Sequence, residues 1–61
     1  MNKQKIRQLI SELKGEVRDN RREMKDRAKN EVYGDAAHLY SVNTALIYVI
    51  NRMENLLKER D

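Results

Sequence analysis

Three side chains in the middle of the sequence have the types that nucleophilic catalysis uses: Asp35, His38 and Ser41. In serine hydrolases a carboxylate orients a histidine, and the histidine takes a proton from the attacking serine. Here the residues follow one another at intervals of three, so they lie along one helix surface, and no strand or sharp turn supplies an oxyanion hole. We interpret them as a helix-capping aspartate and a histidine near an interface, and we expect no enzyme activity.

Metal, cofactor and disulfide chemistry have equally little support. The chain has no cysteine and a single histidine, so disulfides and the common zinc sites are not expected. Neither a glycine-rich phosphate loop, nor an HExxH pair, nor the spacing of an EF-hand occurs. We therefore expect no cofactor and no bound metal.

Size and composition favour a small helical protein that self-associates. Sixty-one residues without cysteine must rely on one core, which in so short a chain rarely supplies more than about 3–5 kcal/mol. Oligomerisation is the stabilising device that remains. Charged residues make up 38% of the chain and proline is absent, as in long helices and coiled coils.

The same composition predicts a soluble, cytoplasmic chain without a membrane partner. The first ten residues, MNKQKIRQLI, are charged from the start, so a signal peptide is not expected. The longest apolar run, Ala45–Ile50, is too short to cross a bilayer. The net charge of +3 permits anionic partners without requiring them.

Apolar residues fall into two helical registers, which predict an all-α, antiparallel two-helix hairpin in a single domain, 1–61. Gly34 suits the left-handed residue that ends a helix, and Asp35 suits the N-cap of the next. We therefore expect helix 1 over about 2–33, a turn at 33–35 and helix 2 over about 35–60. The first stripe consists of Ile6, Ile10, Leu13, Val17 and Met24, flanked by Leu9 and Ala28. The second consists of Leu39, Val42, Leu46, Val49, Met53 and Leu56, widened by Ile50 and Leu57.

Polar residues interrupt these stripes at defined places. Asn20 and Arg27 take two core-type positions of helix 1, and Asn43 lies at the edge of the second stripe. A buried asparagine in a helical seam commonly fixes register, and we predict that role for Asn20 and, in the same way, Asn43. Gly15 lies inside helix 1 and is read either as a tolerated surface glycine or as a point where another backbone approaches closely.

The charges of helix 1 separate onto the two flanks of its stripe. The basic flank contains Lys3, Arg7, Lys14, Arg18, Arg21, Arg22, Lys25 and Lys29. The acidic flank contains Glu12, Glu16, Asp19, Glu23 and Asp26. One interpretation is a solvated coiled-coil helix whose flanks pair with a neighbour, and the other is a basic rail along a nucleic acid. The acidic flank and the lack of aromatic residues among the basic ones weigh against nucleic acid.

Helix 2 carries more apolar surface than helix 1 can cover, since its apolar and aromatic arc exceeds half of its circumference. We predict an oligomer interface formed by Leu39, Val42, Leu46, Val49, Ile50, Met53 and Leu57. Candidate partner-binding residues are Arg18, Arg21, Arg22, Lys25, Lys29, Tyr33, Tyr40, Ile47 and Tyr48. The arc is explained by self-association into a four-helix bundle, by docking of a foreign protein, or by a small-molecule pocket between subunits.

These patterns favour a small non-enzymatic regulator or inhibitor that binds another protein and self-associates through helix 2. The alternative is a nucleic-acid-binding bundle that uses the basic flank of helix 1. In size and helical pattern the hairpin resembles the Rop-type RNA-binding bundles of plasmids. That resemblance concerns architecture, and no residue of a Rop site is assigned to this chain.

Overall fold

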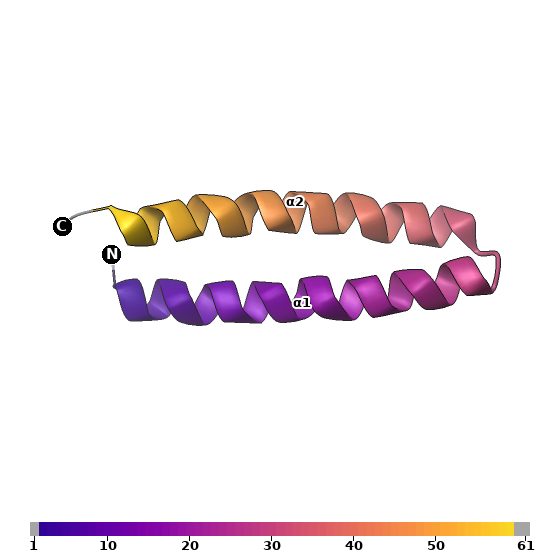
Figure 1. Cartoon of the computed structure of the whole chain (residues 1–61), viewed down its shortest axis with the longest axis horizontal. Helices are drawn as coiled ribbons and strands as arrows, with labels where there is room; N and C mark the ends of the chain where they lie inside the picture. The colour runs from indigo at the N-terminus through magenta and orange to yellow at the C-terminus, as the bar shows by residue number, and fades with distance from the viewer. Residues whose placement is uncertain (1, 60–61) are drawn as a thin grey trace.

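A computed structural model describes residues 2–59 and consists of two long helices that lie side by side in opposite directions (Figure 1). Helix α1 spans Lys3–Lys29 and helix α2 spans Tyr33–Lys58. Together they form a rod with principal extents of 48 × 15 × 12 Å. The prediction of an all-helical hairpin is confirmed, and within residues 2–59 neither helix is long and apolar enough to cross a membrane.

Helix α1 begins at a side-chain cap. Asn2 has extended backbone angles, and its Oδ1 accepts a hydrogen bond of 2.8 Å from the backbone N–H of Gln4. This bond satisfies one of the N–H groups that the first turn of a helix leaves without a partner. Asn2 therefore defines where α1 starts.

The turn lies at residues 30–32, so the sequence-based placement at 33–35 was wrong. Helix α1 ends at Lys29, and Glu31 adopts the left-handed conformation with φ of 63°. The backbone N–H of Glu31 donates to the carbonyl of Ala28, and that of Val32 donates to the carbonyl of Arg27. These two bonds form the Schellman motif that closes many helices. A glutamate, rather than Gly34, occupies the left-handed position.

Helix α2 consequently starts earlier than its sequence indicated. Its N-cap is Val32, which provides no side-chain hydrogen bond, and Gly34 has a negative φ inside the first turn. The prediction that Asp35 caps the helix was wrong, since Asp35 lies in the first turn instead. Its carboxylate still suits that place, because the N-terminal end of a helix carries partial positive charge.

The apolar core of the hairpin lies in the half away from the turn. Within residues 2–59, the buried apolar side chains are Ile6, Ile10, Val17 and Ile50. Partly buried residues that pack against them are Leu13, Leu46, Met53 and Leu57. Burying such a side chain fully contributes roughly 1.5–3 kcal/mol, so this small cluster accounts for most of the attraction between the helices.

An asparagine pair sets the register of the two helices. Asn43 is only 4% exposed; its Oδ1 accepts a 2.9 Å bond from Nδ2 of Asn20, and its Nδ2 donates to the carbonyl of Val17 at 3.1 Å. The predicted register role gains a physical basis, because the buried Asn43 side chain is satisfied by Asn20 and by the backbone carbonyl of Val17, both of which belong to α1. The point midway between residues 20 and 43 falls at the observed turn. A turn centred on Gly34 would slide α2 past α1 and separate the pair.

Candidate interaction faces

The two flanks of α2 lie on opposite sides of the hairpin, and each presents a different row of residues. Val42, Val49 and Leu56 recur every seven residues and line one flank. The other flank carries a second heptad row, Tyr33, Tyr40 and Ile47. Two residues along a helix correspond to a rotation of about 200°, so Val49 and Ile47 lie on nearly opposite flanks. Because α1 packs between these flanks, each forms part of a separate broad face of the hairpin.

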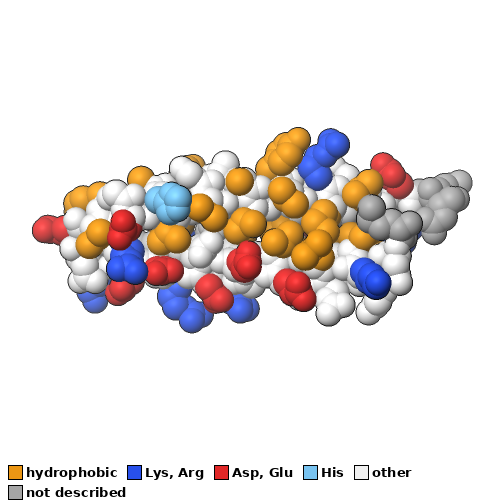
Figure 2. All heavy atoms as spheres, turned by 180° about the vertical axis from the view of Figure 1, so that it is seen from behind, with side chains coloured by type: hydrophobic (Ala, Val, Ile, Leu, Met, Phe, Trp, Pro, Cys, Tyr) orange, Lys and Arg blue, Asp and Glu red, His pale blue; other side chains and the backbone are white. Residues whose placement is uncertain are grey.

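We call the first of these the apolar face. It consists of the Val42–Val49–Leu56 flank of α2 together with the acidic flank of α1. Figure 2 shows this side, with hydrophobic side chains gathered over α2 and along the seam, and acidic side chains along α1. Val49 and Leu56 are 43% and 42% exposed, and Val42 is half-buried. Helix α1 therefore leaves an apolar strip uncovered on this side.

The second, the basic face, contains a cleft of ≈ 420 Å³ between the helices. Its floor is formed by Val17 and Ile50, which are buried, and by Ile47, which is 36% exposed. Its rim is polar and consists of Lys14, Arg18, Arg21, Asn51 and Glu54. This volume lies at the lower end of the range of clefts that hold small ligands or inserted side chains.

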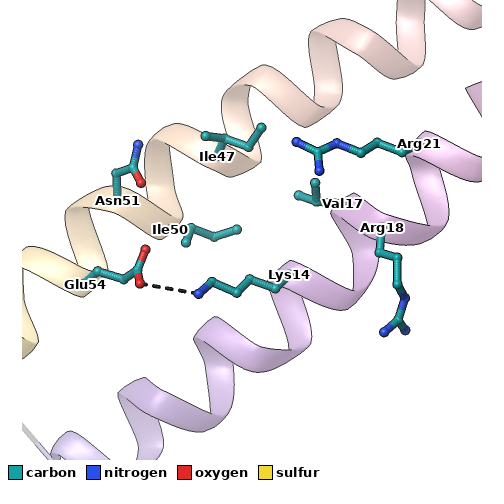
Figure 3. A pocket seen from close by; sticks show the side chains of 8 residues that line it. All are labelled: Lys14, Val17, Arg18, Arg21, Ile47, Ile50, Asn51 and Glu54. Carbon is teal, nitrogen blue, oxygen red and sulfur yellow. Dashed lines mark hydrogen bonds and ion pairs between the residues drawn. The ribbon is translucent and has the colours of Figure 1, made fainter.

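Charged groups stand at both ends of this cleft (Figure 3). At one end Nζ of Lys14 lies 3.4 Å from Oε2 of Glu54, an ion pair that connects α1 to α2. At the other end stands the guanidinium of Arg21, with Ile47 and Val17 beside it. Arg18 points away from the floor and lies 3.5 Å from Asp19 of its own helix. The cleft therefore combines an apolar floor with a positively charged rim.

A shallower apolar hollow continues the basic face toward the turn. It is lined by Arg21, Met24, Lys25, Ala28 and Ala36. Arg21 borders both the cleft and the hollow, so the two form one continuous surface along α1. The basic side chains of this face thus alternate with apolar floor rather than forming an unbroken row.

The seven residues predicted to form an oligomer interface occupy three environments in the hairpin. Ile50 is buried against α1, and Leu46, Met53 and Leu57 pack against the same cluster. Leu39 and Val42 are half-buried, while Val49 is exposed. Leu56, which the sequence interpretation left out of this set, is as exposed as Val49. Its place seven residues after Val49 puts it on the same exposed flank of α2, which the sequence could have indicated.

The predicted partner-binding residues are only partly brought together. Arg18, Arg21 and Ile47 line the cleft, and Lys25 borders the neighbouring hollow. Arg22, Lys29 and all three tyrosines are exposed, and Tyr48 lies on the outer surface of α2, away from α1. Sequence reasoning missed Asn51 and Glu54 as members of the cleft. Their spacing of four and seven residues from Ile47 places them on its flank of α2, and this spacing could have revealed them.

Arg27 makes a charged contact within its own helix. Nη2 of Arg27 donates to Oε1 of Glu23 at 3.0 Å, one turn earlier in α1. This hydrogen bond, together with the charge of Glu23, raises the pKa of the Arg27 guanidinium. Arg27 thus covers a core-type position with its stem while its charge is paired locally.

Asp35, His38 and Ser41 do not form a relay in the part of the chain that the structure describes. All three side chains are exposed, and none is hydrogen-bonded to another within residues 2–59. Over the same residues, no group of three His, Cys, Asp or Glu side chains is placed to hold a metal ion.

No family model, curated protein or solved structure matches this chain. Function is therefore inferred from the two faces of the hairpin and their chemistry.

Proposed function

We propose that this chain is a small non-enzymatic regulator or inhibitor that binds another protein and self-associates through α2. One observation carries the proposal: the strip of Val42, Val49 and Leu56 remains uncovered after α1 has packed against α2. Contiguous exposed apolar surface of this kind usually marks an interface. The proposed contact with a second copy is this strip, with Ile50 and Leu57 beneath it as the core that supports it.

Self-association explains the strip because the hairpin alone has little core. Within residues 2–59 the buried apolar cluster contains four side chains, which is few for a rod 48 Å long. A twofold contact between two apolar strips would bury Val49 and Leu56 on both copies at once. The acidic flanks of α1 border the strip and would remain at its solvent-exposed rim.

Sedimentation equilibrium at micromolar concentration tests this contact. We expect a dimer or higher assembly for the natural chain, and a folded monomer when Val49 and Leu56 are both changed to Asp. The control is Tyr48→Asp, which adds one of the two negative charges on the outer surface of α2 and should leave the assembly intact. A well-folded monomer of 7.3 kDa for the natural chain would refute self-association.

A nucleic-acid-binding bundle is the second candidate, and the exposed row of Tyr33 and Tyr40, on the same flank of α2 as Ile47, favours it. Exposed tyrosines can stack on bases. Phosphate binding would release counterions, so affinity would fall steeply with salt.

A gel-shift titration at about 0.15 M salt separates the two candidates. The control protein carries Arg18, Arg22 and Lys25 changed to Glu, and all three are exposed. We expect only weak, sequence-independent attraction of the natural hairpin to DNA or RNA. Sub-micromolar binding that disappears in the charge-reversed protein would overturn the preferred proposal.

A further inference from the structure

We infer that the cleft on the basic face is the docking site for an acidic amphipathic helix of the partner protein. An apolar side chain of that helix enters between Val17 and Ile47, and carboxylates on its flanks meet Lys14 and Arg21. This inference rests on the proposed function and assigns the partner's contact to the face opposite the apolar strip.

The floor of the cleft favours a protein over a nucleic acid. Ile47 is 36% exposed above the buried side chains of Val17 and Ile50, so an apolar group placed there removes further apolar surface from water. A phosphate backbone gains nothing from such a floor, because it is recognised by charge and by hydrogen-bond donors. A leucine-type side chain, in contrast, fits both the volume and the chemistry of the site.

The rim selects for negative charge on that partner. Lys14 and Arg21 stand at the two ends of the floor, and Glu54 is the single carboxylate of the lining, while Arg18 points outward beside Asp19. Within residues 2–59 Arg21 makes neither an ion pair nor a side-chain hydrogen bond, so its guanidinium is available. The Lys14–Glu54 pair is largely exposed, with side chains 58% and 41% accessible, and such pairs are weak enough for a competing carboxylate to replace them.

The spacing of the cations defines the partner's pattern. Lys14 and Arg21 are seven residues apart on α1, which corresponds to two helical turns, or about 10 Å. A partner helix that lies along the cleft therefore places acidic residues at positions i and i+7. Its apolar residues fall between them, at i+3 and i+4, in the arrangement of an amphipathic helix in a groove.

A designed peptide tests the inference directly. The probe is a helix-forming peptide of about 20 residues, long enough to populate a helix, with glutamates at i and i+7 and leucines at i+3 and i+4. A second peptide of identical composition has the leucines distributed around the helix, and a single-stranded RNA of about 20 nucleotides provides a charged polymer without apolar groups. Binding is measured by fluorescence anisotropy at about 0.15 M salt, and the contact is mapped from amide shifts of the labelled hairpin.

Charge variants of the hairpin locate the contact. Arg21→Glu should weaken binding of the amphipathic peptide at least about tenfold, because it replaces an attraction with a repulsion. Glu54→Gln should strengthen the binding about two- to fivefold, since Lys14 is then released. The matched control is Lys5→Glu, which makes the same charge change seven residues before Glu12, on the acidic flank of α1. That variant should alter affinity less than about twofold.

The outcomes separate this inference from its alternatives. Preference for the amphipathic peptide, with the expected order of the variants and shifts at Ile47 and Asn51, supports it. Equal binding of the rearranged peptide or of RNA would overturn it in favour of general polyanion binding, and absence of peptide binding would overturn it outright. The assembly measured with Val49 and Leu56 changed to Asp reports on the apolar face alone, so failure of the cleft and failure of self-association are distinguishable. Circular dichroism of each variant verifies that it remains helical.

Discussion

The half of the hairpin away from the turn and the half that contains the turn hold their helices together by different means. In the first half, Ile6, Ile10, Val17 and Ile50 are buried in a shared cluster. In the second half, no described side chain between Val17 and Asn43 is buried, although Met24 and Leu39 are partly covered. In the turn half the two helices are joined by the chain itself, whose turn is closed by the backbone hydrogen bonds of the Schellman motif.

The comparison shows where a partner can add stability. Side chains in the first half form the buried cluster, while Leu9, Val49 and Leu56 on its surface stay exposed. In the turn half, Leu39, Val42 and Tyr40 retain exposed surface that a second molecule can cover. Regions with few buried apolar contacts open more readily, so binding should order the turn half more than the other.

Alanine substitutions in the two halves should show the largest difference in the free energy of unfolding. Ile50→Ala removes a buried side chain and should lower the free energy of unfolding by about 2–5 kcal/mol. Leu39→Ala removes a half-buried one and should cost less than about half of that. Lys25→Ala, on the exposed surface, should stay within about 0.5 kcal/mol. Urea denaturation at one fixed protein concentration measures all three, and equal losses for Ile50 and Leu39 would contradict the comparison.

The asparagine pair at the boundary of the halves should have the next largest effect. Asn43→Ala removes two hydrogen bonds from a buried site and should cost about 1–3 kcal/mol. Asn20→Ala should cost less, because Asn20 is partly exposed and Asn43 keeps its bond to Val17. A double-mutant cycle measures the coupling between them, with exposed Asn55→Ala as the control. Additive losses would show that the two side chains do not act as a pair.

Glu31→Gly addresses the turn itself. A left-handed backbone is strained for a residue with a Cβ, so glycine should raise the free energy of unfolding by about 0.5–1 kcal/mol. In a chain of this size, that corresponds to several degrees in Tm, observable by circular dichroism. The control is Glu31→Ala, which removes the charge but keeps the Cβ. If alanine stabilises as much as glycine, charge rather than backbone strain is responsible.

Gly34→Ala should have the smallest effect. Gly34 lies in the first turn of α2 with a negative φ, and a Cβ built there meets nothing within 4 Å. Alanine should therefore stabilise the helix by a few tenths of a kcal/mol, up to about 1 kcal/mol. A decrease in Tm at fixed concentration would mean that Gly34 has a left-handed conformation in solution, as its sequence first indicated.

The part of the fold that could be predicted from the sequence is the part that the spacing of apolar residues along each helix defines. The stripe of α1 is narrow, so Ile6, Ile10 and Val17 could be assigned to its buried side. The arc of α2 is wide, and several rotations of the helix satisfy the pattern equally well. The sequence therefore did not reveal that Ile50 would be buried against α1 while Val49 would remain exposed.

The turn and the cleft escaped sequence reasoning for separate physical reasons. Glutamate seldom adopts the left-handed conformation, so a glycine three residues later was the more obvious choice for the turn. The cleft depends on which residues of α2 lie opposite Lys14 and Arg21, and this follows from the register of the two helices. That register is fixed by the contact between Asn20 and Asn43, which periodicity within either helix does not contain.

The placement of the apolar strip and the cleft on opposite faces has a consequence for valency. If two hairpins associate through their apolar strips, their basic faces point outward on both sides of the assembly. Each assembly then presents two equivalent docking sites that do not obstruct each other. A partner that is itself multimeric would be held by both sites, and its apparent affinity would exceed that of a single cleft by avidity. Loss of the apolar contact would then weaken capture of such a partner without any change in the cleft.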